Sequence, residues 1–109
     1  MNIEATRMTI GFGPGAVPSM PAYDDDVISV DYSDLLLRTL DIANCSLVIT
    51  PLFGPGFDAI ELLEQLAETP FCGSVRVEAP KLPNKRMVLR ELRSVGDRTG
   101  IHVDLVELG

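Results

Sequence analysis

The sequence predicts an α/β protein with a five-stranded, mostly parallel β-sheet and three helices. Short β-branched or apolar segments alternate with segments whose apolar residues recur at helical spacing, an order typical of parallel sheets with right-handed crossovers. The chain has 109 residues, which suits one domain with one modest core. We therefore expect a single domain over residues 1–109, in which residues 1–26 supply a strand and a loop and residues 27–109 supply the order βαβαβαβ.

The N-terminal elements are a strand, an irregular segment and a second strand. The first strand is expected in residues 7–12, RMTIGF, where Met8 and Ile10 alternate with Thr9 and Gly11. The next residues, GPGAVPSMPAYDDD, contain three prolines and two glycines, so they cannot form a regular helix. The β-branched residues VISV then predict a short strand at 27–30.

A first crossover helix is expected in residues 31–44, where Asp31 or Ser33 can cap the N-terminus. Residues 46–50, SLVIT, follow as an apolar strand. The apolar residues of the helix recur at helical spacing and are Leu35, Leu36, Leu40 and Ile42.

The second helix is expected in residues 56–69, after a Gly/Pro turn, with Asp58 as its cap and Pro70 at its end. One face of this helix is predicted to be apolar. It consists of Phe57, Ile60, Leu63, Leu66 and Ala67.

The C-terminal third predicts strand, helix and strand. Residues 74–79, SVRVEA, alternate strictly, and Asn84 can cap a helix that Gly100 ends. Residues 101–108, IHVDLVEL, form the last expected strand. The expected apolar residues of the helix are Met87, Val88, Leu92 and Val95.

The alternation in three of the strands predicts a sheet with one apolar and one polar face. Parallel strands that are buried on both faces have continuous apolar runs instead. Three fates are open to the polar face: solvation, cover by residues 13–26, or contact with a second copy or partner. Its mixture of apolar and charged side chains favours an interface, so we expect a homodimer. The expected interface residues are Thr9, Arg76, Glu78, His102, Asp104 and Val106, with Leu108, Val48 and Thr50 beside them.

Composition and charge exclude several classes of function. The chain is 46% hydrophobic and 23% charged, which is typical of a globular protein. A formal net charge of −7 repels phosphate backbones, so nucleic acid is not an expected partner. There is no signal-peptide pattern and no apolar run near the roughly 20 residues that span a bilayer, so we expect a cytoplasmic protein without membrane contact.

The chemistry-bearing residues do not predict an enzyme or a metal site. Cys45, Cys72 and His102 lack metal-ligand spacing, and no nucleophile and base stand together in the sequence. Both thiols are expected to be free and partly buried, because a cytoplasmic protein rarely forms disulfides. We expect no catalytic residue, no metal and no cofactor.

Residues 27–108, about three quarters of the chain, resemble a response-regulator receiver domain. Receivers typically carry a segment such as DLVLLDLMLPGMDGLELL, and this chain has SLVITPLFGPGFDAIELL. The Pro55–Gly56 turn, Phe57, Asp58 and the helix start fall in register, and the spacing from VISV to SLVIT also matches. The resemblance implies a flavodoxin-like sheet of order 2-1-3-4-5.

The resemblance also implies that phosphotransfer is lost. The phospho-accepting aspartate of the family falls on Pro51, which has no carboxylate, and its strand-four Thr or Ser falls on Ala79. The strand-five lysine is absent, and GFGPGA replaces the acid pair after strand one. The run Asp24–Asp26 comes later, and whether it binds a cation stays open. The first and last receiver helices are expected to be missing, which leaves three helices on one face of a truncated domain.

These implications predict a non-catalytic signalling adaptor, a pseudo-receiver that binds a histidine kinase or another signalling protein. Lys81, Lys85 and Arg86 would form its partner surface, beside the signalling face that helix four and strand five form in the family. One alternative is a self-assembling structural subunit that uses the open sheet face. Another is a small-molecule-binding protein that uses the carboxyl ends of the strands; Thr50, Glu78, Lys81 and Asp24–Asp26 would line its crevice.

Overall fold

The computed structural model describes residues 6–10 and 27–108, and these form an α/β fold. One five-stranded sheet has the order β2-β1-β3-β6-β7, and every neighbouring pair is parallel. Counted along the chain, this order is the predicted 2-1-3-4-5. The strands of this sheet are β1 (Thr6–Ile10), β2 (Val27–Val30), β3 (Cys45–Pro51), β6 (Ser74–Pro80) and β7 (His102–Leu108).

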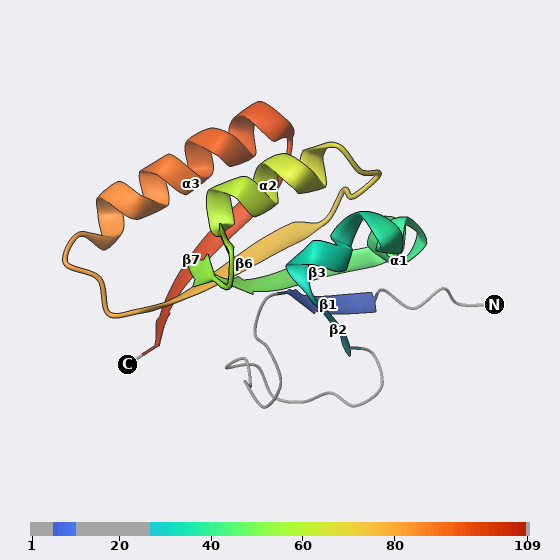
Figure 1. The fold of residues 1–109 in the computed structure, drawn as a ribbon. Coiled ribbons are helices and arrows are strands. Elements are labelled where there is room, and N and C mark those ends of the chain that lie inside the picture. Colours follow the sequence, from blue (N-terminus) through green and yellow to red (C-terminus); the bar gives the residue numbers. More distant parts are fainter. Residues whose placement is uncertain (1–5, 11–26, 109) are drawn as a thin grey trace.

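The helices of the described chain lie on one side of this sheet (Figure 1). Between β3 and the second α-helix, a two-residue antiparallel pair, β4 (Phe53–Gly54) and β5 (Phe57–Asp58), encloses the predicted Pro55–Gly56 turn. The helices are a 3₁₀ helix η2 (Tyr32–Arg38), α1 (Thr39–Ala43), α2 (Ala59–Ala67) and α3 (Lys85–Thr99).

The core lies between the helices and one face of the sheet. Met8, Val48, Val75 and Val103 are neighbours across four strands, and all four are buried in one hydrophobic cluster. Thr50 shares this face, because it pairs with Val77 of the same cluster. The prediction that Val48 and Thr50 lie on the polar face is therefore wrong. In each strand the face alternates by residue, and the register between strands, which decides the face, cannot be read from SLVIT alone.

The first crossover differs from the regular helix that the sequence predicts. Residues 32–38 form a 3₁₀ helix, and the side chain of Asp31 makes no cap hydrogen bond. Leu35 and Ile42 are buried as expected, but Leu36 and Leu40 are 58% and 81% exposed. A 3₁₀ helix has three residues per turn and not 3.6, so Leu36 lies outside the inner face of η2. The exposed Leu40 belongs to α1, which follows this change of helix type.

Helix α2 has the predicted cap but a shifted apolar face. Asp58 Oδ1 accepts a hydrogen bond of 2.8 Å from the backbone N–H of Glu61. The helix begins only at Ala59, so Phe57 belongs to strand β5 and not to the helix. Ala67, which was predicted on the apolar face, is exposed. The buried residues of α2 are Ala59, Leu62, Leu63 and Leu66.

Helix α3 begins and ends where the sequence predicts. Asn84 Oδ1 accepts a 3.1 Å hydrogen bond from the N–H of Met87, and Gly100 ends the helix with a left-handed φ of 77°. Leu92 and Val95 are buried, whereas Met87 is half exposed, contrary to expectation. Met87 lies in the first turn of α3 and is not among the side chains packed against the hydrophobic cluster.

Some expectations fall outside the described residues. These are the loop at residues 13–26, its run Asp24–Asp26, and the missing first receiver helix. Within the described chain, no helix has the length and apolar character needed to cross a bilayer.

Candidate functional site

The carboxyl end of the central strand β3 is the first candidate site. Pro51 is the last residue of β3 and pairs with Glu78 of β6, which Ala79 follows directly. The structure thus brings Pro51 and Ala79, two positions that the resemblance singles out, to neighbouring strand ends. Pro51 offers no nucleophile, and Ala79 is buried without a hydroxyl group.

Backbone hydrogen bonds fix the carboxyl end of β3. The N–H of Leu52 donates to the carbonyl of Glu78 over 2.8 Å, and the N–H of Ala59 donates to the carbonyl of Leu52 over 2.9 Å. These bonds tie the end of β3 to β6 and to the start of α2. The Thr50 hydroxyl is buried and lies 3.1 Å from the Pro51 carbonyl, to which it donates. Thr50 therefore does not line an open crevice, although the ligand-binding alternative predicted that it would.

Glu78 does not line a crevice either. Its side chain is 1% exposed and its Oε2 lies 3.4 Å from Nε of Arg76. Across the described residues, no group of three or more His, Cys, Asp or Glu side chains gathers closely enough to hold a metal ion.

The six predicted interface residues do share one face of the sheet. The register aligns Thr9 with Ile49, Ile49 with Arg76 and Arg76 with Asp104, and it aligns Glu78 with Val106. None of the described helices lies on this face (Figure 1). His102 follows the same alternation on β7, where its Nε2 lies 3.2 Å from Asp104 Oδ2.

This face is only partly accessible. His102 and Asp104 are exposed, whereas Thr9 and Glu78 are 4% and 2% exposed. Thr9 and Glu78 are therefore too buried to belong to an exposed interface. Strand alternation predicts the side of the sheet on which a residue lies, but not whether that side is covered. The apolar Leu47 and Val106 are half-buried, so the accessible part of this face mixes apolar and charged groups.

A basic surface lies on helix α3 and the segment before it, residues 81–98. This segment holds six of the nine Lys and Arg residues and two acids, and so carries a formal charge of +4. The other three cations and fourteen acids give the rest of the chain a charge of −11. The six basic residues are Lys81, Lys85, Arg86, Arg90, Arg93 and Arg98.

All three residues of the predicted partner surface are exposed on this segment. Lys81 directly follows β6, and Lys85 and Arg86 lie in the first turn of α3. Arg90 and Arg93, which were not predicted, are also exposed and extend the same basic surface. The spacing of residues 86, 90 and 93, four and three apart, is the signal that places them on successive turns of the helix.

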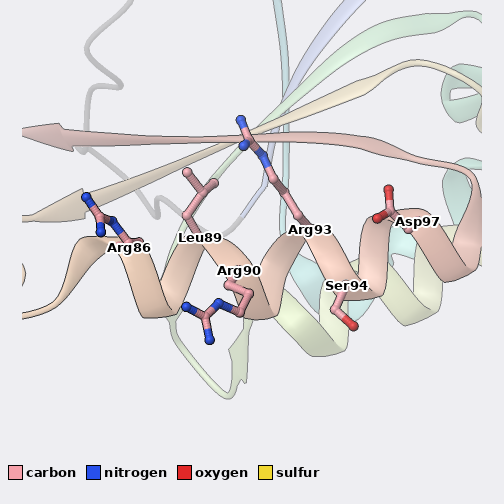
Figure 2. A pocket seen from close by; sticks show the side chains of 6 residues that line it. All are labelled: Arg86, Leu89, Arg90, Arg93, Ser94 and Asp97. Carbon is pink, nitrogen blue, oxygen red and sulfur yellow. The ribbon is translucent and has the colours of Figure 1, made fainter.

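These arginines border a shallow depression of about 540 Å³ along α3 (Figure 2). Arg86, Leu89 and Arg93 point to one side of the helix, and Arg90 points to the other. Nη2 of Arg93 lies 3.7 Å from Asp104 Oδ1 on β7. A pair with both side chains more than half exposed is weak, so Arg93 can exchange Asp104 for an external carboxylate at little cost.

Both thiols are free, as expected. Cys45 is buried and donates to the carbonyl of Leu47 over 3.1 Å. Burial raises the pKa of its thiol, so the neutral form is favoured. Cys72 is exposed, which is contrary to the prediction that both thiols are partly buried.

Comparison with known proteins does not add a relative. No protein-family model, no curated protein and no solved structure matches the chain.

Proposed function

We propose that the protein is a non-catalytic signalling adaptor, a pseudo-receiver that cannot accept a phosphoryl group and acts through protein–protein contact. The observation that carries this proposal is Pro51 at the carboxyl end of the central strand of a parallel 2-1-3-4-5 sheet. That strand end is where the receiver resemblance requires a carboxylate. Proline has no group that can attack phosphorus.

The basic surface of residues 81–98 supports a partner with an acidic surface. The exposed side chains of Arg86 and Arg90 lie one helical turn apart, and the guanidinium fork matches a carboxylate with two hydrogen bonds. A +4 segment on a chain whose other residues carry −11 favours one orientation of approach. We propose that the partner is a histidine kinase or another signalling protein.

Phosphotransfer is tested with acetyl phosphate and Mg²⁺, and separately with an autophosphorylated histidine kinase, with intact-mass spectrometry as the readout. We expect no added phosphoryl mass, while a competent receiver in the same reaction is modified. An acid-labile phosphoryl group on this chain would contradict the proposal.

Partner binding is tested by capture from the native cell, followed by charge reversal. We expect Arg86→Glu with Arg90→Glu to abolish capture of the partner that the unmodified chain retains. Arg38→Glu is the matched control, because Arg38 is exposed in the first crossover and pairs with Asp41 at 3.3 Å. Equal capture by both variants would exclude the basic surface.

Self-assembly through the sheet face without described helices is a second candidate. It is favoured by the exposed His102 and Asp104 beside the half-buried Leu47 and Val106, a mixture found at interfaces. Light scattering should then give the mass of a homodimer. A monomer at high micromolar concentration would contradict this candidate and leave the adaptor proposal standing.

A further inference from the structure

We propose that an apolar pocket at the carboxyl end of the sheet binds a small organic cation, an amine with an aromatic or branched aliphatic body. The pocket has a volume of about 360 Å³, within the range of small-molecule sites. Three segments supply its walls: the end of β3 with the β4–β5 pair, the first turn of α2, and α3 with the loop before it. The apolar walls include Leu52, Phe53, Ile60, Leu82, Val88 and Leu92.

The position of the pocket is one where α/β proteins place ligands. Leu52 follows β3 and Leu82 follows β6, so the pocket lies just beyond the carboxyl ends of two neighbouring strands. Ligands of open α/β sheets bind in this region. The described lining includes neither Pro51 nor Ala79, so ligand binding here does not depend on the proposed adaptor function.

The walls require an apolar ligand body. Leu92 is fully buried at the base, while Ile60, Leu82 and Val88 are half-buried. Phe53 is 75% exposed at the rim, so a ligand that covers its ring removes apolar surface from water.

The charged groups at the pocket favour a cation. Asp58 and Glu91 are the charged residues among those described as lining it. The lining does not include Lys81 or Arg86, although both lie on the flanking segment. An aromatic ring such as that of Phe53 also attracts cations at its face.

The N-terminus of α2 opposes this preference, because helix N-termini attract anions. Asp58 already offsets that effect, since its Oδ1 accepts from the N–H of Glu61. An ionised carboxylate has further acceptor positions, so Asp58 can cap the helix and also face an ammonium group. With Glu91, the lining carries two carboxylates.

The test is an NMR titration of the full chain with three probes of similar size: 2-phenylethylamine, 2-phenylethanol and phenylacetate. We expect saturable shifts at the amides of Phe53, Ile60 and Val88 with the amine. We expect the alcohol to bind about threefold more weakly, as for an ion pair near the surface, and phenylacetate to bind more weakly still. Absence of saturable shifts at these residues, or tighter binding of phenylacetate, would overturn the proposal.

Variants separate the pocket from the surrounding surface. Val88→Trp fills the pocket and should abolish binding of the amine. Met87→Trp adds the same ring on the same turn of α3, outside the lining, and should leave binding unchanged. Equal binding by the two variants would overturn the proposal.

Charge-removing variants test the ammonium preference without filling the pocket. Asp58→Asn keeps a good helix cap, and Glu91→Gln keeps the side-chain size. Each should reduce the threefold preference for the amine over the alcohol, whereas Glu68→Gln, exposed at the end of α2, should not. An unchanged preference in both pocket variants would overturn the assigned charge of the ligand. A protein partner that fills the pocket in place of the probe would overturn the assignment of a small-molecule ligand.

Discussion

The ring of Tyr32 stacks on the ring of Phe57, with centroids 4.4 Å apart and planes inclined by 8°. Tyr32 opens the 3₁₀ helix after β2, whereas Phe57 lies in β5, directly before α2. The contact therefore joins two consecutive crossover segments. Phe57 is the buried ring of the pair. Burial, and next the charge of Glu61, raise the pKa of the Tyr32 hydroxyl.

We predict that this ring pair stabilises the fold beyond the area it buries. A double-mutant cycle with Tyr32→Leu and Phe57→Leu should give a coupling free energy of about 1 kcal/mol, the usual value for a stacked pair. The measurement is urea unfolding of the four proteins. A coupling near zero would mean that each ring contributes only through its own burial.

We predict that Gly96→Ala destabilises the protein although alanine favours helices. A Cβ at residue 96 would lie 2.5 Å from the carbonyl oxygen of Ile101 and 3.0 Å from Val103 Cγ2. Steric overlap in a packed core costs about 1 to 3 kcal/mol, more than the roughly 1 kcal/mol that helix propensity returns. We expect a net loss of about 1 kcal/mol, read from the urea midpoint.

Ser94→Ala is the matched control for this change. Ser94 is exposed on the same helix, so its substitution should change the free energy of unfolding by less than about 0.5 kcal/mol. A stabilised Gly96→Ala would show that α3 and β7 can separate without cost.

We predict that Arg76→Met is more harmful than Arg76→Met combined with Glu78→Met. The single change removes a positive charge that lies 3.4 Å from a carboxylate whose side chain is 1% exposed. Loss of one partner of a fully buried pair costs about 3 kcal/mol, and we expect a smaller loss here because the Arg76 side chain is 31% exposed, whereas replacing both by apolar groups is often neutral. Thermal unfolding of both variants decides this, and a double variant less stable than the single one would refute it.

The buried thiol of Cys45 predicts a loss of stability at high pH. Burial raises its pKa in the folded state, so the folded protein holds this proton more tightly than the unfolded chain does. The resulting stabilisation is present below the thiol pKa of the unfolded chain, about 8.5, and is lost as pH rises through the higher folded value. The raised pKa of Tyr32 acts in the same direction at higher pH.

Urea unfolding between about pH 8 and pH 10 tests this expectation. Cys45→Val should lose less stability with rising pH than the unmodified chain, in a Tyr32→Phe background that removes the second group. Cys72→Val, at the exposed thiol, should not alter the pH dependence. Identical slopes for all three proteins would contradict the prediction.

The strands could be predicted from the sequence, because alternating, β-branched or apolar residues mark each of them and the helices between them favour parallel pairing. Their order was expected only from the receiver resemblance. The side of the sheet on which Val48 and Thr50 lie could not be predicted, since it depends on the register between strands. The prediction of which residues form the inner face of the first crossover was also wrong, because sequence spacing does not distinguish a 3₁₀ helix from an α-helix over Tyr32–Arg38.

The candidate sites were predictable to different degrees. The neighbouring positions of Pro51 and Ala79 follow from parallel strands whose ends meet at one edge. The burial of Thr9 and Glu78 does not follow, because alternation is silent on what covers a face. The apolar pocket was missed because its walls come from separate segments, each of which reads as ordinary core or turn.

Among the described residues, 81–98 carry +4 and the others, with three cations and ten acids, carry −7, and this separation of charge gives the described part of the molecule a permanent electric dipole. In the field of a charged surface, such a molecule is turned before contact, and its α3 end leads toward negative potential. The torque fades beyond about 8 Å at physiological salt. The ionic-strength dependence of an association rate would therefore report which end of this acidic protein meets its partner first.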